Sequence, residues 1–263
     1  MHTYWLGERT ETPRGQKTIE PRELGKHYDV VYLAFGLVRP ENVVSLDFLC
    51  WKHWDRDSLQ TQIRELQEQD TEVILSIGGW GGNSWSSVND VEMLADRLVQ
   101  VVVDWKLDGL SIDFMGDRDL HHFTVDEPNK ETVYYLPELS RLLRERLPRE
   151  ARLILSTHDV SDFVLGSIAL FDWVLSIDYK TSPQNFDRLT KHSQNVNGPP
   201  VVIGITLQDP FMPLDTAKAL VLHAMKNGSP SSVFWVANED HHDFTGLKTN
   251  SYAEMANDTL PVR

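Results

Sequence analysis

The stretch Leu107-Asp108-Gly109-Leu110-Ser111-Ile112-Asp113-Phe114-Met115 decides the fold class of this chain. A short run of mostly apolar residues is typical of a parallel strand that is buried on both faces. Alternation along a strand sorts the small and polar residues onto one face and the large apolar residues onto the other. The first face would line a barrel and carry a buried carboxylate, which needs partners because an isolated buried charge is costly. This inner face holds Gly109, Ser111, Asp113 and Met115, and the outer face holds Leu110, Ile112 and Phe114.

Similar apolar runs alternate with longer amphipathic stretches along the whole chain. This alternation predicts an α/β protein, a single (β/α)8 TIM barrel with no insertion domain. The alternative, a doubly wound open sheet, would carry a glycine-rich phosphate turn after its first strand, and Trp5-Leu6-Gly7-Glu8 is not one. The predicted strands are Thr3–Gly7, Asp29–Leu37, Glu72–Gly78, Leu107–Met115, Arg152–Thr157, Trp173–Tyr179, Val201–Thr206 and Ser232–Ala237. The predicted helical stretches include Leu59–Leu66, Val91–Trp105, Leu136–Leu147 and Ala217–Met225.

The composition limits both size and partners. With 263 residues the chain has room for one such barrel, and we expect one domain over residues 1–263. Its net charge of -14 makes it an acidic protein and argues against nucleic acid or an anionic membrane as partners, because like charges repel. No apolar run is long enough to span a bilayer. Residues Met1–Trp5 do not resemble a signal peptide, so we expect a cytoplasmic protein unless a leader was removed.

No metal and no other cofactor is expected. Cys50 is the one cysteine, which excludes an internal disulfide and a cysteine-rich metal site. The pairs His121-His122 and His241-His242 are adjacent residues, which point to opposite faces of a strand, so neither pair easily chelates one ion. The sequence leaves the oligomeric state open.

Candidate site residues lie at the carboxyl ends of the predicted strands, where barrels of this kind build their sites. One strand ends in Ser76, Gly78 and Gly79, and the two glycines suggest a close backbone approach or a positive φ. From adjacent strands, Ser76 and Ser111 are plausible hydrogen-bond donors to Asp113. The other candidates are Phe35, Trp80, His158, Tyr179, Trp235 and Asn238.

Together these strand ends resemble glycoside hydrolase family 18, the chitinases and chitinase-like lectins. Ser76, Gly78 and Gly79 match the family's Ser-x-Gly-Gly, and Tyr32-Leu33-Ala34-Phe35 is similar to its Tyr-Ala-Phe segment. The remaining family signatures are Asp-Gly-x-Asp-x-Asp-x-Glu on the fourth strand, Met-x-Tyr-Asp on the sixth and a Trp on the eighth. The resemblance implies a barrel whose carboxyl-terminal face binds N-acetylglucosamine-type oligosaccharides.

The departures from these signatures fall on the catalytic positions. Asp108, Gly109 and Asp113 match, but Ser111 replaces the first inner aspartate and Met115 replaces the glutamate that protonates the leaving group. On the sixth strand Tyr179 matches, whereas Ile177 and Lys180 replace Met and Asp. In this family the substrate's acetamido oxygen is the nucleophile, so the enzyme must supply the acid, and Met115 has no proton to give. The resemblance therefore implies no useful chitinase activity.

Three functions fit this combination. The first is a pseudoenzyme, a lectin-like protein in which Asp113 and Tyr179 still hold an acetamido group. The second is a repurposed intracellular lyase, isomerase or cyclase that acts on a small metabolite with the same residues and His158. The third is a residual glycosidase whose acid is displaced to Asp117 or Asp178. Each of them takes a small-molecule or oligosaccharide ligand.

Overall fold

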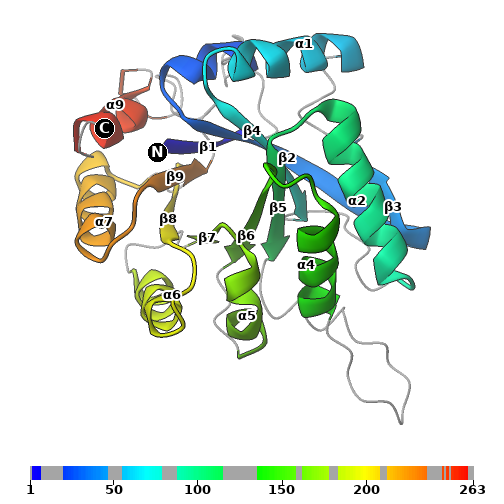
Figure 1. The fold of residues 1–263 in the computed structure, drawn as a ribbon. Coiled ribbons are helices and arrows are strands. Elements are labelled where there is room, and N and C mark those ends of the chain that lie inside the picture. The colour runs from blue at the N-terminus through cyan, green and yellow to red at the C-terminus, as the bar shows by residue number, and fades with distance from the viewer. Residues whose placement is uncertain are drawn as a thin grey trace.

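The computed structural model shows a parallel β-barrel surrounded by helices (Figure 1). It describes residues 2–6, 20–46, 55–78, 88–114, 135–157, 162–177, 183–207, 212–235, 245, 247–248 and 250–259, and only the backbone of residues 2–6, 114, 135, 162–164 and 235. The sheet order is β1-β9-β8-β7-β6-β5-β4-β2-β3, and a further parallel pairing of β1 with β2 closes the barrel. This closure confirms the predicted (β/α)8 barrel. Its parallel strands are β1 (His2–Leu6), β2 (Val30–Arg39), β4 (Glu72–Gly78), β5 (Gly109–Phe114), β6 (Arg152–Thr157), β7 (Trp173–Ser176), β8 (Val201–Thr206) and β9 (Ser232–Trp235).

The helices lie around the outside of the strands and bury one stripe each against them (Figure 1). Two of them begin at aspartates: the side chain of Asp55 accepts from Ser58 N and that of Asp90 from Met93 N, each at 2.8 Å. No described helix has the length and apolar content needed to cross a membrane. The described helices are η1 (Pro21–Lys26), α1 (Arg56–Gln67), α2 (Val91–Trp105), α4 (Tyr135–Arg146), α5 (Asp162–Ser167), η6 (Ile168–Leu170), α6 (Gln184–Asn195), α7 (Leu214–Lys226) and α9 (Ser251–Thr259).

A hairpin extends the sheet beyond the barrel, and the sequence did not predict it. Strand β2 continues to Arg39, and the short turn η2 (Pro40–Asn42) leads into β3 (Val43–Ser45), which pairs antiparallel with β2. Asn42 Nδ2 donates to Asn89 Oδ1 at 2.8 Å, which ties the turn to the residues just before α2. Strand β3 is too short to show a period in the sequence, so only its pairing reveals it.

Two strands have bounds that differ from the prediction. Strand β7 stops at Ser176 rather than at Tyr179, and β9 is described as far as Trp235. Strand β5 begins at Gly109 rather than at Leu107. At the end of β7, Ser176 pairs with Thr157, which is the last described residue of β6, and Ile177 N donates to Thr157 O at 2.9 Å. A strand lasts only as long as its partners do, and this is not visible in its own sequence.

Two separate cores hold the barrel together, one between the sheet and the helices and one inside the strands. Inside, Trp173 Nε1 donates to the hydroxyl of Tyr32 at 2.9 Å, and burial raises the pKa of that phenol well above its usual range. At the amino-terminal end, Arg152 bonds Glu72 at 2.9 Å and lies over the Trp173 ring, with its guanidinium carbon 5.6 Å from the ring centroid. Each of these two hydrogen bonds joins side chains from strands that are not neighbours in the sheet.

Asp172 joins the start of β7 to the start of β6, and its loss should destabilise the fold. Its Oδ2 accepts from Leu153 N at 2.7 Å and from Arg144 at 2.8 Å. We expect Asp172→Ala to lower the free energy of unfolding by about 2 kcal/mol, because hydrogen bonds to charged groups are lost and a backbone N–H loses its acceptor. Urea unfolding measures the change. Asp187→Ala, which breaks an exposed contact to His223, is the control and should cost less than about 1 kcal/mol; equal losses would contradict the prediction.

Candidate functional site

The described part of the candidate site lies where β4, β5 and β6 end. Leu110 and Ile112 pack into the outer core, so Ser111 and Asp113 occupy the inner face of β5, as alternation predicts. Asp113 is 1% exposed, and it pairs in register with Gly78 on β4 and Ser156 on β6. The structure thus places the carboxylate deep at the carboxyl end of the barrel.

Ser111 bonds another serine inside the barrel. Its Oγ lies 2.9 Å from Ser156 Oγ, and both residues are fully buried. Ser76 on β4 pairs in register with Ser111 and is also fully buried. The expected donation from Ser76 or Ser111 to Asp113 is not among the described hydrogen bonds, and the two-serine contact stands there instead.

Ser156 is a residue of this site that sequence reasoning missed. The signal was available, because alternation along Arg152–Thr157 puts residues 152, 154 and 156 on one face, and Ile154 lies in the inner core. The contact between the hydroxyls of Ser156 and Ser111 could not be predicted from this alternation, because it depends on how β5 and β6 align.

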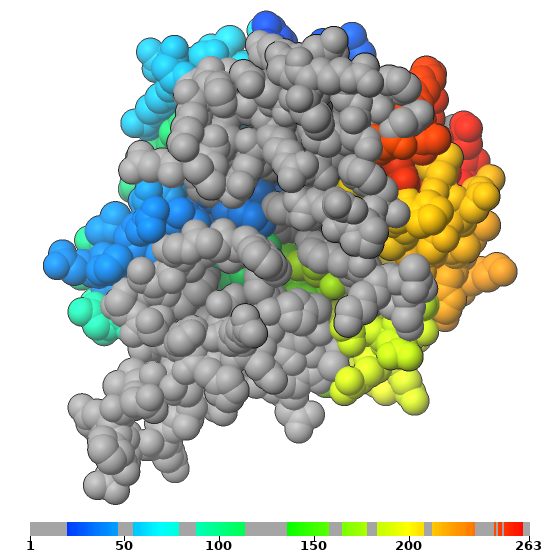
Figure 2. All heavy atoms as spheres, turned by 180° about the vertical axis from the view of Figure 1, so that it is seen from behind, coloured from blue at the N-terminus to red at the C-terminus, as the bar shows by residue number. Residues whose placement is uncertain are grey.

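Two other candidates have described positions. Gly78 has φ 112°, so the positive φ that its place at a strand end suggested is confirmed. Phe35 is buried in the inner core and follows a cis Ala34–Phe35 peptide bond, beside an irregularity in the pairing of β2 with β4. Figure 2 shows the molecule from the side opposite to Figure 1, and atoms in the blue of β2 are visible near its middle.

The structure does not describe the side chains of the other predicted site residues. Trp235 is the last residue of β9 and pairs with Thr206, and only its backbone is described. The residues that lie outside the described part of the chain are Met115, Gly79, Trp80, His158, Tyr179 and Asn238, and with them Asp117, Asp178 and Lys180. The structure therefore brings together Ser76, Gly78, Ser111 and Asp113, and adds Ser156.

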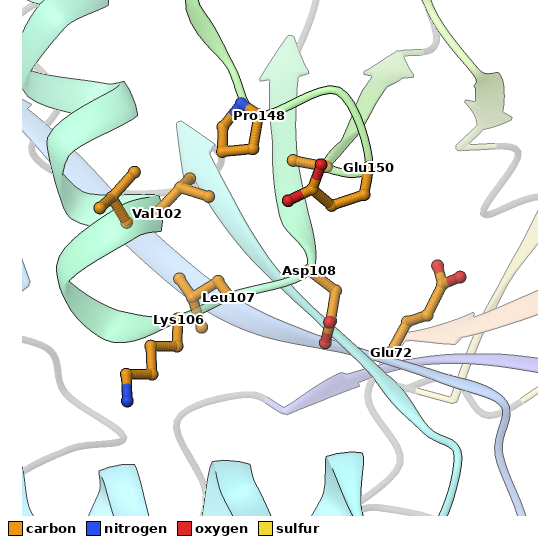
Figure 3. A pocket seen from close by; sticks show the side chains of 9 residues that line it. Glu72, Val102, Lys106, Leu107, Asp108, Pro148 and Glu150 are labelled. Atoms are coloured by element: carbon orange, nitrogen blue, oxygen red, sulfur yellow. The ribbon is translucent and has the colours of Figure 1, made fainter.

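A cavity of about 360 Å³ lies at the opposite end of the barrel, where β4, β5 and β6 begin (Figure 3). Two of its three carboxylates have partners: Glu72 bonds Arg152, and Asp108 Oδ2 accepts from Val73 N at 2.7 Å and Gln67 Nε2 at 2.8 Å. Within the described ranges, no three His, Cys, Asp or Glu side chains are placed to hold a metal ion. Barrel enzymes build their sites at the other end, so this cavity is not the candidate site. Its lining residues are Glu72, Val102, Val103, Lys106, Leu107, Asp108, Pro148, Glu150 and Ala151.

Solved chitinases share this fold over almost the whole chain. A GH18 chitinase from Pseudoalteromonas aurantia is 20% identical with a TM-score of 0.76, and the match covers 98% of this chain and 99% of that chain. The Group IV chitinase of Ostrinia furnacalis is 14% identical with a TM-score of 0.73, over 98% and 99% of the two chains. YKL-39, solved in the presence of chitooligosaccharides (GlcNAc4), is 12% identical with a TM-score of 0.68, over 100% of both chains. A search of curated protein sequences finds no match.

The family is established by a sequence match, since structural likeness at these identities shows only the fold. The model described as Glycosyl hydrolases family 18 matches residues 3–199, which run from β1 through α6. The matched range includes the strand that carries Asp113 and the paired serines of β4, β5 and β6. The chain belongs to glycosyl hydrolase family 18.

Proposed function

We propose that this chain is a chitinase-like protein that binds N-acetylglucosamine-type oligosaccharides, or a related compact ligand, without hydrolysing them. The ligand would bind at the carboxyl-terminal face of the barrel, in one domain formed by residues 1–263. The observation that carries the proposal is Met115, which stands in the sequence where the family motif has its acid glutamate. A thioether cannot protonate a leaving group, and a general acid typically accelerates such a step by about 10²–10⁴-fold.

Asp113 supports the binding half of the proposal. It is buried on the inner face of β5, two positions before Met115, and the family motif has an aspartate at the same place. A buried carboxylate there can accept a hydrogen bond from an acetamido N–H, with Tyr179 as the second polar contact. Solved relatives include a protein crystallised with chitooligosaccharides, which is consistent with a sugar ligand.

Thermal unfolding with a panel of sugars tests the binding proposal. N-acetylglucosamine, chitobiose and chitotetraose are compared with cellotetraose, which has the same linkage but no acetamido group. A ligand at 100 times its Kd stabilises the folded state by about 2.7 kcal/mol, which corresponds to a rise in Tm of roughly 5–10 °C for a chain of this size. We expect such a rise with the acetamido sugars and none with cellotetraose.

Variants show whether Asp113 makes the contact. Asp113→Asn should raise the Kd for chitobiose by about 10-fold to 100-fold, because a charge-assisted hydrogen bond is lost while the shape is kept. Asp187→Asn, on the outer helix α6, is the matched control and should leave the Kd unchanged. If none of the sugars moves the Tm, the binding proposal is wrong, and the alternative, a lyase, isomerase or cyclase that uses Asp113 and Tyr179 on a small metabolite, takes its place.

A further inference from the structure

Three serine hydroxyls lie side by side inside the barrel, on three consecutive strands. Ser76 on β4 pairs in register with Ser111 on β5, and Ser111 Oγ lies 2.9 Å from Ser156 Oγ on β6. All three residues are 0% exposed. The residues that alternate with these serines pack into the outer core, so the three hydroxyls lie on the inner face, together with Ile74 and Ile154.

These hydroxyls have more hydrogen-bonding capacity than the protein uses. Each serine carries one donor and two acceptor lone pairs. Among the described residues, the contact between Ser111 and Ser156 is the only hydrogen bond that the three hydroxyls make, and Ser76 Oγ has no partner. Two of the three hydroxyl protons therefore remain without an acceptor in a layer that bulk solvent does not reach. Leaving buried polar groups in this state is costly, and folded proteins rarely do it.

We propose that this layer is a binding site for one buried water molecule, which bridges Ser76 to the Ser111–Ser156 pair. Water both donates and accepts, so one molecule can take the spare proton of the serine pair and complete the bonding of Ser76. Buried waters in proteins typically make about three such bonds to groups that otherwise have no partner. The inference concerns the barrel interior and is independent of the carbohydrate binding proposed above.

The surroundings favour a water molecule over an anion. Asp113 follows Ser111 on the same face and pairs in register with Ser156, so an anion would lie beside a buried carboxylate and be repelled. Gly78 follows Ser76 on the inner face of β4 and adds no side chain there, whereas Ile154 of β6 pairs in register with Ser111 and fills part of the same layer. Ser111 also stands where the family motif has an aspartate, and a serine fills less of the interior than a carboxylate does.

A crystal structure of the sugar-free protein tests the site directly. We expect one solvent peak at about 2.7–3.2 Å from Ser76 Oγ and from Ser111 or Ser156 Oγ. Oxygen contacts of about 2.3–2.6 Å would instead mark a bound cation and would overturn the proposal. The absence of any peak between the three hydroxyls would overturn it as well.

Stability measurements on two serine variants give an independent answer. We expect Ser76→Ala to lose the solvent peak and to lower the Tm by about 2–4 °C, because bonds to the water are lost. Ser140→Ala is the matched control, since Ser140 on α4 is also 0% exposed and its hydroxyl has no described partner, but it lies among the leucines of the outer core. Its Tm should stay or rise. If Ser76→Ala raises the Tm as Ser140→Ala does, the Ser76 hydroxyl has no bound water and the proposal is refuted. If Ser76→Ala does not fold, the crystal structure of the unaltered protein decides.

Discussion

The purified protein is expected to release no more product from a fluorogenic chitobioside than its Asp113→Asn variant does. The physical reason is the missing acid, because the family reaction relies on the substrate's own acetamido oxygen as nucleophile and on the enzyme for a proton. General acid catalysis contributes about 10²–10⁴-fold, and Met115 cannot supply it. Continuous fluorescence at neutral and mildly acidic pH measures the rate.

Restoring the family residues at these positions is expected to create the hydrolytic activity that the unaltered chain lacks. A variant that carries Ser111→Asp, Met115→Glu and Lys180→Asp should gain hydrolysis of at least about 100-fold over the unaltered chain. The control replaces Met115 by Gln in the same background, because glutamine has the shape of glutamate and no proton to transfer. Hydrolysis that appears with Glu and is absent with Gln would assign the missing function to position 115.

Steady turnover by the unaltered chain that disappears in Asp113→Ala would contradict the loss of activity. It would mean that another carboxyl acts as the acid. Asp117 and Asp178 are the candidates in the sequence, and Asp117→Asn and Asp178→Asn would show which of them is used. In that case the chain would be a residual glycoside hydrolase rather than a binding protein.

Gly109→Ala should cause the largest stability loss among the single substitutions considered for this chain. A Cβ at Gly109 would lie 2.4 Å from Arg152 O and 2.8 Å from Arg152 N, far inside any normal contact. The obstacle is backbone that cannot move aside freely, because Arg152 N donates to Asp108 O at 2.8 Å. We expect a loss of about 3 kcal/mol, with a fall in Tm of roughly 6–12 °C by calorimetry.

Gly166→Ala is the matched control for this substitution. Gly166 lies in α5, and a Cβ built on it has no atom within 4 Å. Alanine restricts the unfolded chain and suits a helix better than glycine, so we expect the free energy of unfolding to stay the same or rise by up to about 1 kcal/mol. Similar losses in both variants would mean that glycine at 109 is not required by the approach of β6, and the prediction would be wrong.

Local patterns in the sequence were enough to predict the barrel and the inner face on which Asp113 lies. The alternation from Gly109 to Met115 predicted a buried Asp113 on the inner face, and the structure confirms both its burial and its face. The prediction succeeded because burial alternates along a strand, so the types of the neighbouring residues indicate which face a given residue occupies. The same alternation in Arg152–Thr157 could have found Ser156, had it been applied there.

The pairing between strands could not be predicted from the sequence. The end of β7 at Ser176, the hairpin strand β3 and the hydrogen bonds of Asp172 all depend on segments that are distant in sequence. The register depends on the residues of both paired strands and on the connection between them, so it cannot be predicted from one strand alone.

By itself, the sequence determined the barrel and the family to which the chain is similar, and it predicted that Met115 takes the place of an acid, because each follows from residue type and local spacing. Only the tertiary structure decided that Ser111 meets Ser156, that Ser76 pairs beside them and that Gly109 lies against the backbone of β6. Those contacts join residues whose spacing along the chain has no period. They arise when closure of the barrel fixes the register of each strand against the next, and packing on both faces holds that register.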